Sequence, residues 1–240
     1  MKLLLTRPDG RNHAMAESLT VRGIPFLVCP LLEVTQVAAP HCQTLLDSAD
    51  IVIFISTNAV KYADQQLEHW PSQPRYYAVG NATHQALQQL DVSAIPTPED
   101  NQQTEGLLSL DGLQAEVVHG KRVVIVRGVG GRETLAEQLQ AMGASVSYCQ
   151  VYQRSCPSYD KQSVLNIWQE FGIDTIVITS GEALVNLISL TTKENFSWLQ
   201  ACHIIVPSIR VEQQANKSGF RYITNAGAAN DQAVLNALSL

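Results

Sequence analysis

The chain has 240 residues, of which 45% are hydrophobic and 16% charged, and its formal net charge at pH 7 is −6. This length is enough to bury one or two hydrophobic cores, which excludes a small scaffold held together only by disulfides. The acidic balance and the lack of a Lys/Arg cluster argue against nucleic acid as a partner, and no apolar run is long enough to cross a membrane.

Short apolar runs alternate with stretches of helical period along the whole chain. The first run, residues 3–8, is broken by Arg7 and Pro8 far short of an export signal, so we expect a cytoplasmic protein. Buried parallel strands covered by helices have this pattern, which predicts an α/β fold. The predicted strands are 3–8, 51–56, 76–80, 122–128, 175–180 and 203–208. The predicted helices are 11–22, 57–69, 81–91, 131–142, 160–171, 181–189, 208–218 and 230–239, and two polar loops are expected at 94–106 and 190–197.

The chain contains an internal repeat at a nearly fixed offset. At an offset of 120, Arg7 matches Arg127, Gly23 matches Gly143, and a strand, a turn and a helix keep the same register. At an offset of 124, another strand and the helix after it match again. The repeat predicts two similar α/β domains of about 120 residues each.

An extended segment that ends in proline follows the first strand-helix-strand of each repeat. These segments are residues 31–40 and 151–157, and neither has helical periodicity. They are either linkers between two contiguous halves or crossings that join the N-terminal piece to the C-terminal half. The residues alone leave both arrangements open.

Cofactor and metal motifs are absent from the sequence. Gly128 and Gly130 begin a dinucleotide fingerprint, but Glu133 stands where its third glycine is required, and no phosphate-loop motif is present. The histidines are scattered without ligand spacing, so we expect no metal and no cofactor. The five cysteines form no CxxC pair and lie mostly in apolar surroundings, so we expect buried thiols. The chain is then an enzyme without cofactor or a binding protein.

The turns that follow the predicted strands are rich in residues that donate to anions. Ligands of open α/β sheets bind beyond the carboxyl ends of the strands, where helix N-termini present N–H groups. Each hydroxyl or amide there can instead be a helix cap, and each arginine a surface charge. As a set they predict a cleft for a polyanion, and the matched Arg7 and Arg127 suggest paired binders of carboxylates. The candidates are Arg7, Ser56, Thr57, Asn81, Thr83, Arg127, Gly128, Arg132, Ser180 and Ser208.

Tyr152 is the ionisable residue most suited to chemistry. It lies in the second extended segment, where the chain leaves the second repeat, so its hydroxyl can face a space between domains. A tyrosine remains neutral at pH 7 and can give a proton or hydrogen bond to a departing oxygen. The alternative is an aromatic side chain that only packs on the linker.

The sequence resembles the uroporphyrinogen-III synthase family. The matching pieces, in the family's order and over nearly the whole chain, are LLTRP, FISTNAV, YAVGNAT, VRGVGGRETL, VYQR, ITSGEAL and VPSIR. The resemblance implies two flavodoxin-like parallel-sheet domains joined by a two-stranded ladder. It assigns residues 1–33 and 157–240 to a discontinuous domain and 38–150 to the second, with 34–37 and 151–156 as linkers.

The resemblance also implies a function in porphyrin and heme biosynthesis. Members of the family are cofactor-independent, cyclising hydro-lyases that close hydroxymethylbilane, a linear tetrapyrrole with eight carboxylates, to uroporphyrinogen III with inversion of the last pyrrole ring. The reaction passes through an azafulvene and a spiro intermediate in an interdomain cleft. By analogy Tyr152 is the acid, and Ser56, Thr83 and Ser180 bind carboxylates.

One turn departs from the family's pattern. Some members carry paired threonines where this chain has Ser208 and Ile209, and Ile209 has no side-chain donor, so backbone N–H groups are expected to bind there. We expect a monomer with a small-molecule substrate and neither nucleic acid nor membrane as partner. The alternative is a non-catalytic, hinged two-domain protein that binds a small polyanion.

Overall fold

A computed structural model describes residues 1–240, and the chain forms two compact units. Unit 1 consists of residues 1–34 and 155–240, and unit 2 consists of residues 35–154. The N-terminal piece thus packs with the C-terminal half, as in the crossing arrangement. The extended segments that the sequence left open are the places where the chain passes from one unit to the other.

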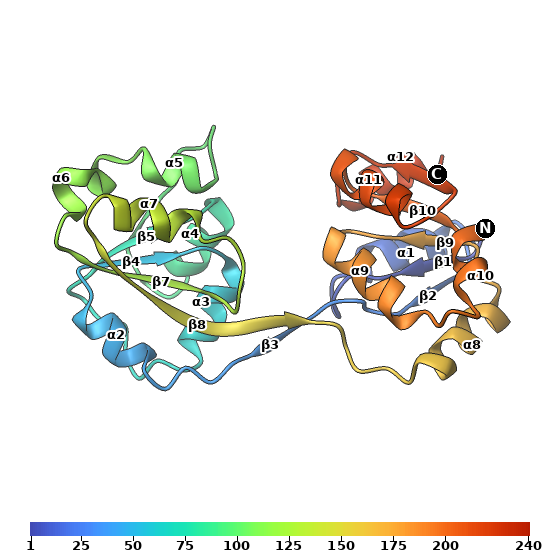
Figure 1. The fold of residues 1–240 in the computed structure, drawn as a ribbon, viewed down its shortest axis with the longest axis horizontal. Helices are drawn as coiled ribbons and strands as arrows, with labels where there is room; N and C mark the ends of the chain where they lie inside the picture. Colours follow the sequence, from blue (N-terminus) through green and yellow to red (C-terminus); the bar gives the residue numbers. More distant parts are fainter. The chain divides into compact units, whose positions relative to one another are not determined.

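Unit 1 is a five-stranded sheet in the order β11-β10-β9-β1-β2, and every neighbouring pair is parallel (Figure 1). The strands are β1 Leu3–Leu5, β2 Phe26–Val28, β9 Thr175–Val177, β10 His203–Val206 and β11 Tyr222–Asn225. The helices are α1 His13–Val21, α8 Lys161–Phe171, α9 Gly181–Leu190, α10 Phe196–Ala201, α11 Ile209–Lys217 and α12 Asp231–Ala237.

Successive residues of the central strands face opposite layers of unit 1. Leu4 packs in one core with residues of α8, α9, α10 and α11. Leu3 and Leu5 pack in the other core with residues of α1 and α12. Both faces of the sheet are therefore covered, which is why these strands have continuous apolar runs rather than alternating ones.

Unit 2 contains a six-stranded sheet in the order β3-β8-β7-β4-β5-β6. Its strands are β3 Glu33–Gln36, β4 Ile51–Phe54, β5 Arg75–Ala78, β6 Ala94–Pro96, β7 Arg122–Gly128 and β8 Ser145–Ser155. Its helices are α2 Cys42–Ser48, α3 Thr57–Asp64, α4 Asn81–Gln88, α5 Thr104–Leu108, α6 Ala115–Val118 and α7 Thr134–Ala141, with a 3₁₀ turn η1 at Asp111–Leu113. The pairing of β3 with β8, two strands that continue past the unit boundary, confirms the predicted ladder.

The two sheets have the same strand order if the strands of unit 2 are counted from β7 instead of from the first strand along the chain. Unit 1 follows 2-1-3-4-5 along the chain, the order of flavodoxin-like folds. Unit 2 follows the same order if β7 is taken first, then β8, β4, β5 and β6. The predicted repeat is therefore confirmed as a circular permutation, in which β7 corresponds to β1 and β4 corresponds to β9.

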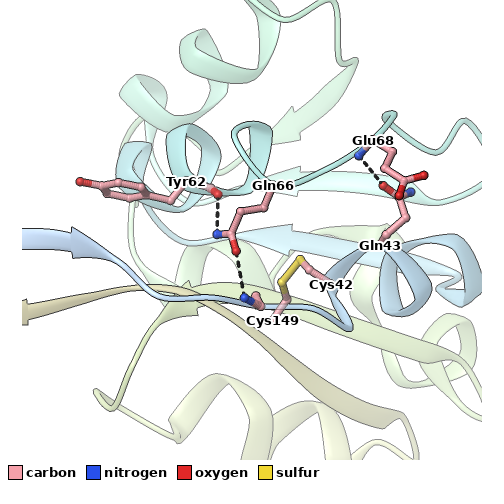
Figure 2. Close-up of a disulfide and its surroundings, with 7 residues drawn as sticks. Cys42, Gln43, Tyr62, Gln66, Glu68 and Cys149 are labelled. Carbon is pink, nitrogen blue, oxygen red and sulfur yellow. Dashed lines mark hydrogen bonds between the residues drawn. A yellow bond between two sulfur atoms is a disulfide. The ribbon is translucent and has the colours of Figure 1, made fainter.

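A disulfide joins α2 to β8 within unit 2. Cys42, the first residue of α2, bonds to Cys149, and their Cα atoms are 5.5 Å apart (Figure 2). Nearby, the Gln66 side chain accepts a hydrogen bond from the Ala39 N–H at 2.9 Å. The prediction of buried thiols is wrong for this pair, because the fold brings distant cysteines together. Cys29 and Cys202 are buried free thiols as expected, whereas free Cys156 is half-buried.

No helix of the structure is both long and apolar enough to span a membrane.

Candidate functional site

A pocket of about 300 Å³ lies in unit 2 at the carboxyl ends of β4 and β7. These two strands are neighbours at the point where the strand order reverses, which is where open α/β sheets bind ligands. Residues from the turns after β4 and β7 form much of the wall, and β8 completes it. The polar and glycine residues that line it are Ser56, Thr104, Arg127, Gly128, Gly130, Gly131, Arg132, Tyr148, Tyr152 and Arg154.

Two hydroxyl groups meet in this pocket. The oxygen atoms of Ser56 Oγ and Tyr152 Oη are 3.0 Å apart, so one donates a hydrogen bond to the other. Ser56 is also the N-cap of α3, because its Oγ accepts the Ala59 N–H at 3.1 Å. The predicted cap and the predicted site residue are thus the same side chain. Because Ser56 Oγ accepts the Ala59 N–H, the hydroxyl hydrogen of Ser56 is available for the bond with Tyr152 Oη.

An irregularity in the sheet places Tyr152 beside the end of β7. Arg127 pairs with Gln150, but the next residue, Gly128, pairs with Tyr152, so β8 holds one extra residue there. Such a bulge redirects the side chains that follow it. A Cβ at position 128 would lie 2.6 Å from the Tyr152 ring, so only glycine leaves room for the ring. The backbone irregularity explains why sequence spacing alone missed this contact.

Tyr152 is also packed as an aromatic residue. It is only 7% exposed, and its ring stacks on that of Tyr62 with 6.0 Å between centroids. The aromatic packing of the alternative reading is therefore present. The ring is fixed by packing, and the hydroxyl reaches the pocket wall beside Ser56.

The two matched arginines are each bound within their own unit. Arg127 is 3% exposed and forms an ion pair with Glu133, with 3.1 Å between Nη1 and Oε1. Arg7 forms an ion pair with Asp231 and donates to the Ala229 carbonyl oxygen at 2.6 Å. The structure thus keeps their equivalence but gives both guanidinium groups internal partners, which sequence reasoning did not identify.

The loop after β7 presents unpaired backbone donors at the pocket. Val129 donates its N–H to the Tyr152 carbonyl oxygen at 2.8 Å. The N–H groups of Gly130, Gly131 and Arg132 donate to no group of the protein. Arg132 is exposed and lines the pocket, so this loop offers both backbone donors and a cation to an anion.

The other predicted unit 2 residues, in the α3 and α4 turns, do not line the pocket. Asn81 begins α4 and is exposed, and its N–H donates to Gln102 Oε1 at 3.2 Å. Thr83 is 3% exposed, so its hydroxyl lies inside the unit. Thr57 begins α3 directly after Ser56 and is half-buried.

In unit 1 the predicted serines are helix caps at the carboxyl ends of the strands. Ser180 caps α9 by accepting the Ala183 N–H at 3.0 Å, and Ser208 caps α11 by accepting the Val211 N–H at 3.5 Å. Ile209, which follows Ser208 and has no side-chain donor, is 68% exposed. The cap readings therefore hold for Ser56, Ser180 and Ser208 alike.

The carboxyl group of Glu133, at the N-terminus of α7 in unit 2, has a shifted pKa. The pKa of Glu133 is lowered, first by the hydrogen bond from the Tyr148 hydroxyl and also by the charge of Arg127. The pKa of Tyr148 is raised by burial and by the same carboxylate. Glu133 is therefore held as an anion and Tyr148 as a neutral donor.

The structure holds no group of three or more His, Cys, Asp or Glu that could bind a metal ion.

Comparison with known proteins agrees with this architecture. The family model described as "Uroporphyrinogen-III synthase HemD" matches residues 13–236. Uroporphyrinogen-III synthase of Salmonella typhimurium is 38% identical over 249 residues, covering 99% of this chain and 100% of the relative. The Escherichia coli enzyme is 34% identical over 253 residues, with the same coverage.

Solved structures share the fold at low sequence identity. Uroporphyrinogen-III synthetase from Helicobacter pylori superimposes with a TM-score of 0.66 at 16% identity, covering 99% of this chain and 98% of that one. A mutant uroporphyrinogen III synthase from Thermus thermophilus gives 0.61 at 13% identity, covering 100% and 99%. From the family match and the full-length relatives, the chain belongs to the uroporphyrinogen-III synthase family.

Proposed function

We propose that the chain closes hydroxymethylbilane to uroporphyrinogen III with Tyr152 as the acid that assists departure of the terminal hydroxyl. Membership of the family supports the overall reaction. The observation that carries the assignment of the acid is the pair of hydroxyls, Ser56 and Tyr152, 3.0 Å apart in a pocket at the switch point of the unit 2 sheet. A proton donor must lie within hydrogen-bond reach of the leaving oxygen, and this pocket contains one.

The proposed first step breaks the bond between the terminal methylene carbon and its hydroxyl oxygen. The oxygen leaves with the electron pair of that bond and takes the Tyr152 proton, so that water departs and an azafulvene cation and a phenolate remain. Ser56 stabilises the phenolate by donating its hydroxyl hydrogen, because its Oγ already accepts the Ala59 N–H. After ring closure through the spiro intermediate, loss of a proton from the last pyrrole ring restores the phenol.

The substrate's carboxylates require donors, because the protein has a net charge of −6 and gives no general attraction to anions. We propose that Arg132 and the unpaired N–H groups beside it bind carboxylates in unit 2, together with the start of α3 at Thr57. The turns at Ser180 and Ser208 would bind others through the N-termini of α9 and α11. In the α4 turn, exposed Asn81 is a further candidate. Thr83 is buried and its N–H already donates to the Gly80 carbonyl oxygen, so we do not propose it as a direct partner of the substrate.

The pairings of the two matched arginines modify their proposed role. Arg7 and Arg127 already bind carboxylates of the protein, so we do not propose them as direct partners of the substrate.

We propose in addition that the enzyme works in the cytoplasm as a monomer without a nucleic-acid partner. Size-exclusion chromatography coupled to light scattering would test the monomer, because a mass near 26.3 kDa is expected.

The proposal is tested by supplying freshly prepared hydroxymethylbilane and separating the porphyrinogen isomers that form. Unaided closure gives the uninverted isomer, so an excess of the inverted type III isomer shows catalysis. We expect Tyr152→Phe to slow turnover by about ten- to a hundredfold, in line with general-acid contributions. The matched control is Tyr222→Phe, which removes the hydroxyl of an exposed tyrosine in unit 1.

Two results would contradict the proposal. A Tyr152→Phe enzyme with the wild-type rate would remove this residue as the acid. A wild-type protein that binds hydroxymethylbilane but gives only the uninverted isomer would be a binding protein, the alternative that the sequence left open.

A further inference from the structure

Arg127 is the most deeply buried charged residue of the pocket wall, at 3% exposure. We propose that Arg127, Glu133 and Tyr148 form a positioning network that fixes the 128–132 loop, and that the loop's N–H groups, rather than this guanidinium, bind a substrate carboxylate. The inference rests on the proposed function, because it assigns how the same pocket recognises its substrate. It differs from the simplest reading of the sequence, in which Arg127 binds the substrate directly.

The network joins four parts of unit 2 in a closed arrangement. Arg127, near the end of β7, places Nη1 3.1 Å from Glu133 Oε1, and its Nη2 donates to the Gly130 carbonyl oxygen. The other carboxylate oxygen of Glu133 accepts the hydroxyl of Tyr148 from β8. The guanidinium also lies over the Tyr148 ring, 4.7 Å from its centroid. A strand, a loop, the N-terminus of α7 and a second strand are thus connected through one cation.

Burial makes this network sensitive to any change in charge. A buried cation requires a partner charge, and Glu133 is the only carboxylate that pairs with Arg127. The Nε atom of Arg127 is buried without any partner, so this donor is not exposed to solvent. A substrate carboxylate that bound Nη1 would compete with Glu133 for this donor. The structure therefore favours an indirect role.

The direction of one peptide group links the network to the loop donors. The Gly130 carbonyl oxygen points at Arg127 Nη2, and in a trans peptide the following N–H points the opposite way. The Gly131 N–H is therefore directed away from the guanidinium, and it has no acceptor in the protein. Gly131 has φ of +98°, and a Cβ there would lie 2.7 Å from Arg127 Nη2. The loop fits closely around the arginine in a conformation that favours glycine.

The equivalent arginine in unit 1 has the same kind of partners. Arg7 lies just beyond the end of β1, the first strand of its repeat, and it too binds one carboxylate, Asp231, and one carbonyl oxygen, that of Ala229. Two copies of the fold thus use an arginine at this place to hold neighbouring backbone. Both repeats therefore bind this arginine within their own unit.

The test compares Glu133→Gln and Arg127→Lys with Arg122→Lys, a control at the opposite end of the same strand. In steady-state assays with hydroxymethylbilane we expect both network variants to raise KM by about tenfold or more, the scale of a lost charged hydrogen bond. We expect kcat to change by less than about threefold, because the acid is untouched. The type III fraction of the product should fall as spontaneous closure competes, and the Arg122→Lys enzyme should match the wild type.

The double variant distinguishes one network from two separate contacts. Arg127→Lys combined with Glu133→Gln should raise KM no further than the worse single variant, because both act through one loop. A raised KM for Arg127→Lys with a wild-type KM for Glu133→Gln would show that Arg127 binds substrate itself and overturn the proposal. Wild-type KM values for both single variants would overturn it as well.

Two arrangements keep the test independent of folding and of the acid assignment. If either variant fails to fold, as judged by thermal unfolding, Tyr148→Phe retains the ring and removes only the hydroxyl bond to Glu133. That variant should still raise KM, and an unchanged KM would count against the network. A wild-type rate in Tyr152→Phe together with raised KM values in the network variants would reject the proposed acid and leave the positioning network standing.

Discussion

Reduction of the Cys42–Cys149 disulfide should destabilise unit 2 and leave unit 1 unchanged. The bond connects residues 107 positions apart, both inside unit 2. Loop-closure entropy for a loop of this length gives about 4.7 kcal/mol of stabilisation, and measured values are typically about 2–4 kcal/mol. We therefore expect the free energy of unfolding of unit 2 to fall by about 2–4 kcal/mol when the bond is reduced.

Hydrogen exchange followed by mass spectrometry measures this change unit by unit. A loss of about 2–4 kcal/mol corresponds to a roughly 30- to 1,000-fold faster exchange of the slowest amides, such as those of β4 at Ile51–Phe54. The amides of β9 and β10 in unit 1 serve as an internal control. A Cys42→Ser/Cys149→Ser variant should exchange as fast as the reduced wild type.

Counting the thiols establishes the starting state of the experiment. Alkylation of the unfolded, unreduced protein should modify the three free cysteines, Cys29, Cys156 and Cys202, and leave the other two unmodified. Five modified cysteines would show that the bond is absent. Equal exchange of unit 2 in the oxidised and fully reduced proteins would show that the long loop contributes no stability, and the entropic reasoning would be refuted.

Three further predictions concern the pocket. Gly128→Ala places a Cβ 2.6 Å from the Tyr152 ring, so steady-state kinetics should show a kcat at least about tenfold lower, and an unchanged kcat would refute the steric argument. Ser56→Ala and Asp160→Ala each remove a helix N-cap and should lower the free energy of unfolding by about 1 kcal/mol, but only Ser56→Ala should slow turnover. The folded-state pKa of Glu133 is below its ordinary value of 4.5, so its stabilising effect is complete above that pH and is lost as the pH falls through the lowered pKa. A carboxyl-detected NMR titration should give that lowered pKa in the wild type, and a midpoint at or above 4.5 would contradict it.

The parts of the fold that local patterns determine follow the sequence closely. Within the predicted strand 51–56, Ile51–Phe54 forms β4 and Ser56 caps the next helix. Gly172 has φ of +81° at the end of α8, where a left-handed residue is needed to end the helix. Buried strands and capped helices depend on neighbours in sequence, and these are visible in the chain.

The features that the sequence did not reveal depend on contacts between distant elements. Helix α2 at Cys42–Ser48 was not predicted, and part of the expected polar loop 94–106 forms β6 and the start of α5. Most of the extended segment 151–157 belongs to β8, a strand of eleven residues at Ser145–Ser155 that runs across the unit boundary. The disulfide and the bulge beside Gly128 arise from the pairing of β8 with other elements.

The same distinction applies to the candidate site. The turns with Ser56 and Gly128 were found because parallel strands bring their carboxyl ends to one edge. The partners of Arg127 were missed because Tyr148 comes from a neighbouring strand and Glu133 was considered only as a failed glycine position. A charged residue that ends an apolar strand is itself a signal of burial, and such a residue requires an internal partner.

Binding of the product to isotope-labelled protein tests the central claim most directly, because it locates the ligand without relying on activity. Under anaerobic conditions, titration with uroporphyrinogen III should shift the backbone amide signals of Gly130, Gly131 and Arg132 most strongly, with those at the start of α3. Saturating product that leaves these amides unshifted, while amides elsewhere in unit 2 respond, would show that the pocket at the ends of β4 and β7 is not where this enzyme holds its tetrapyrrole.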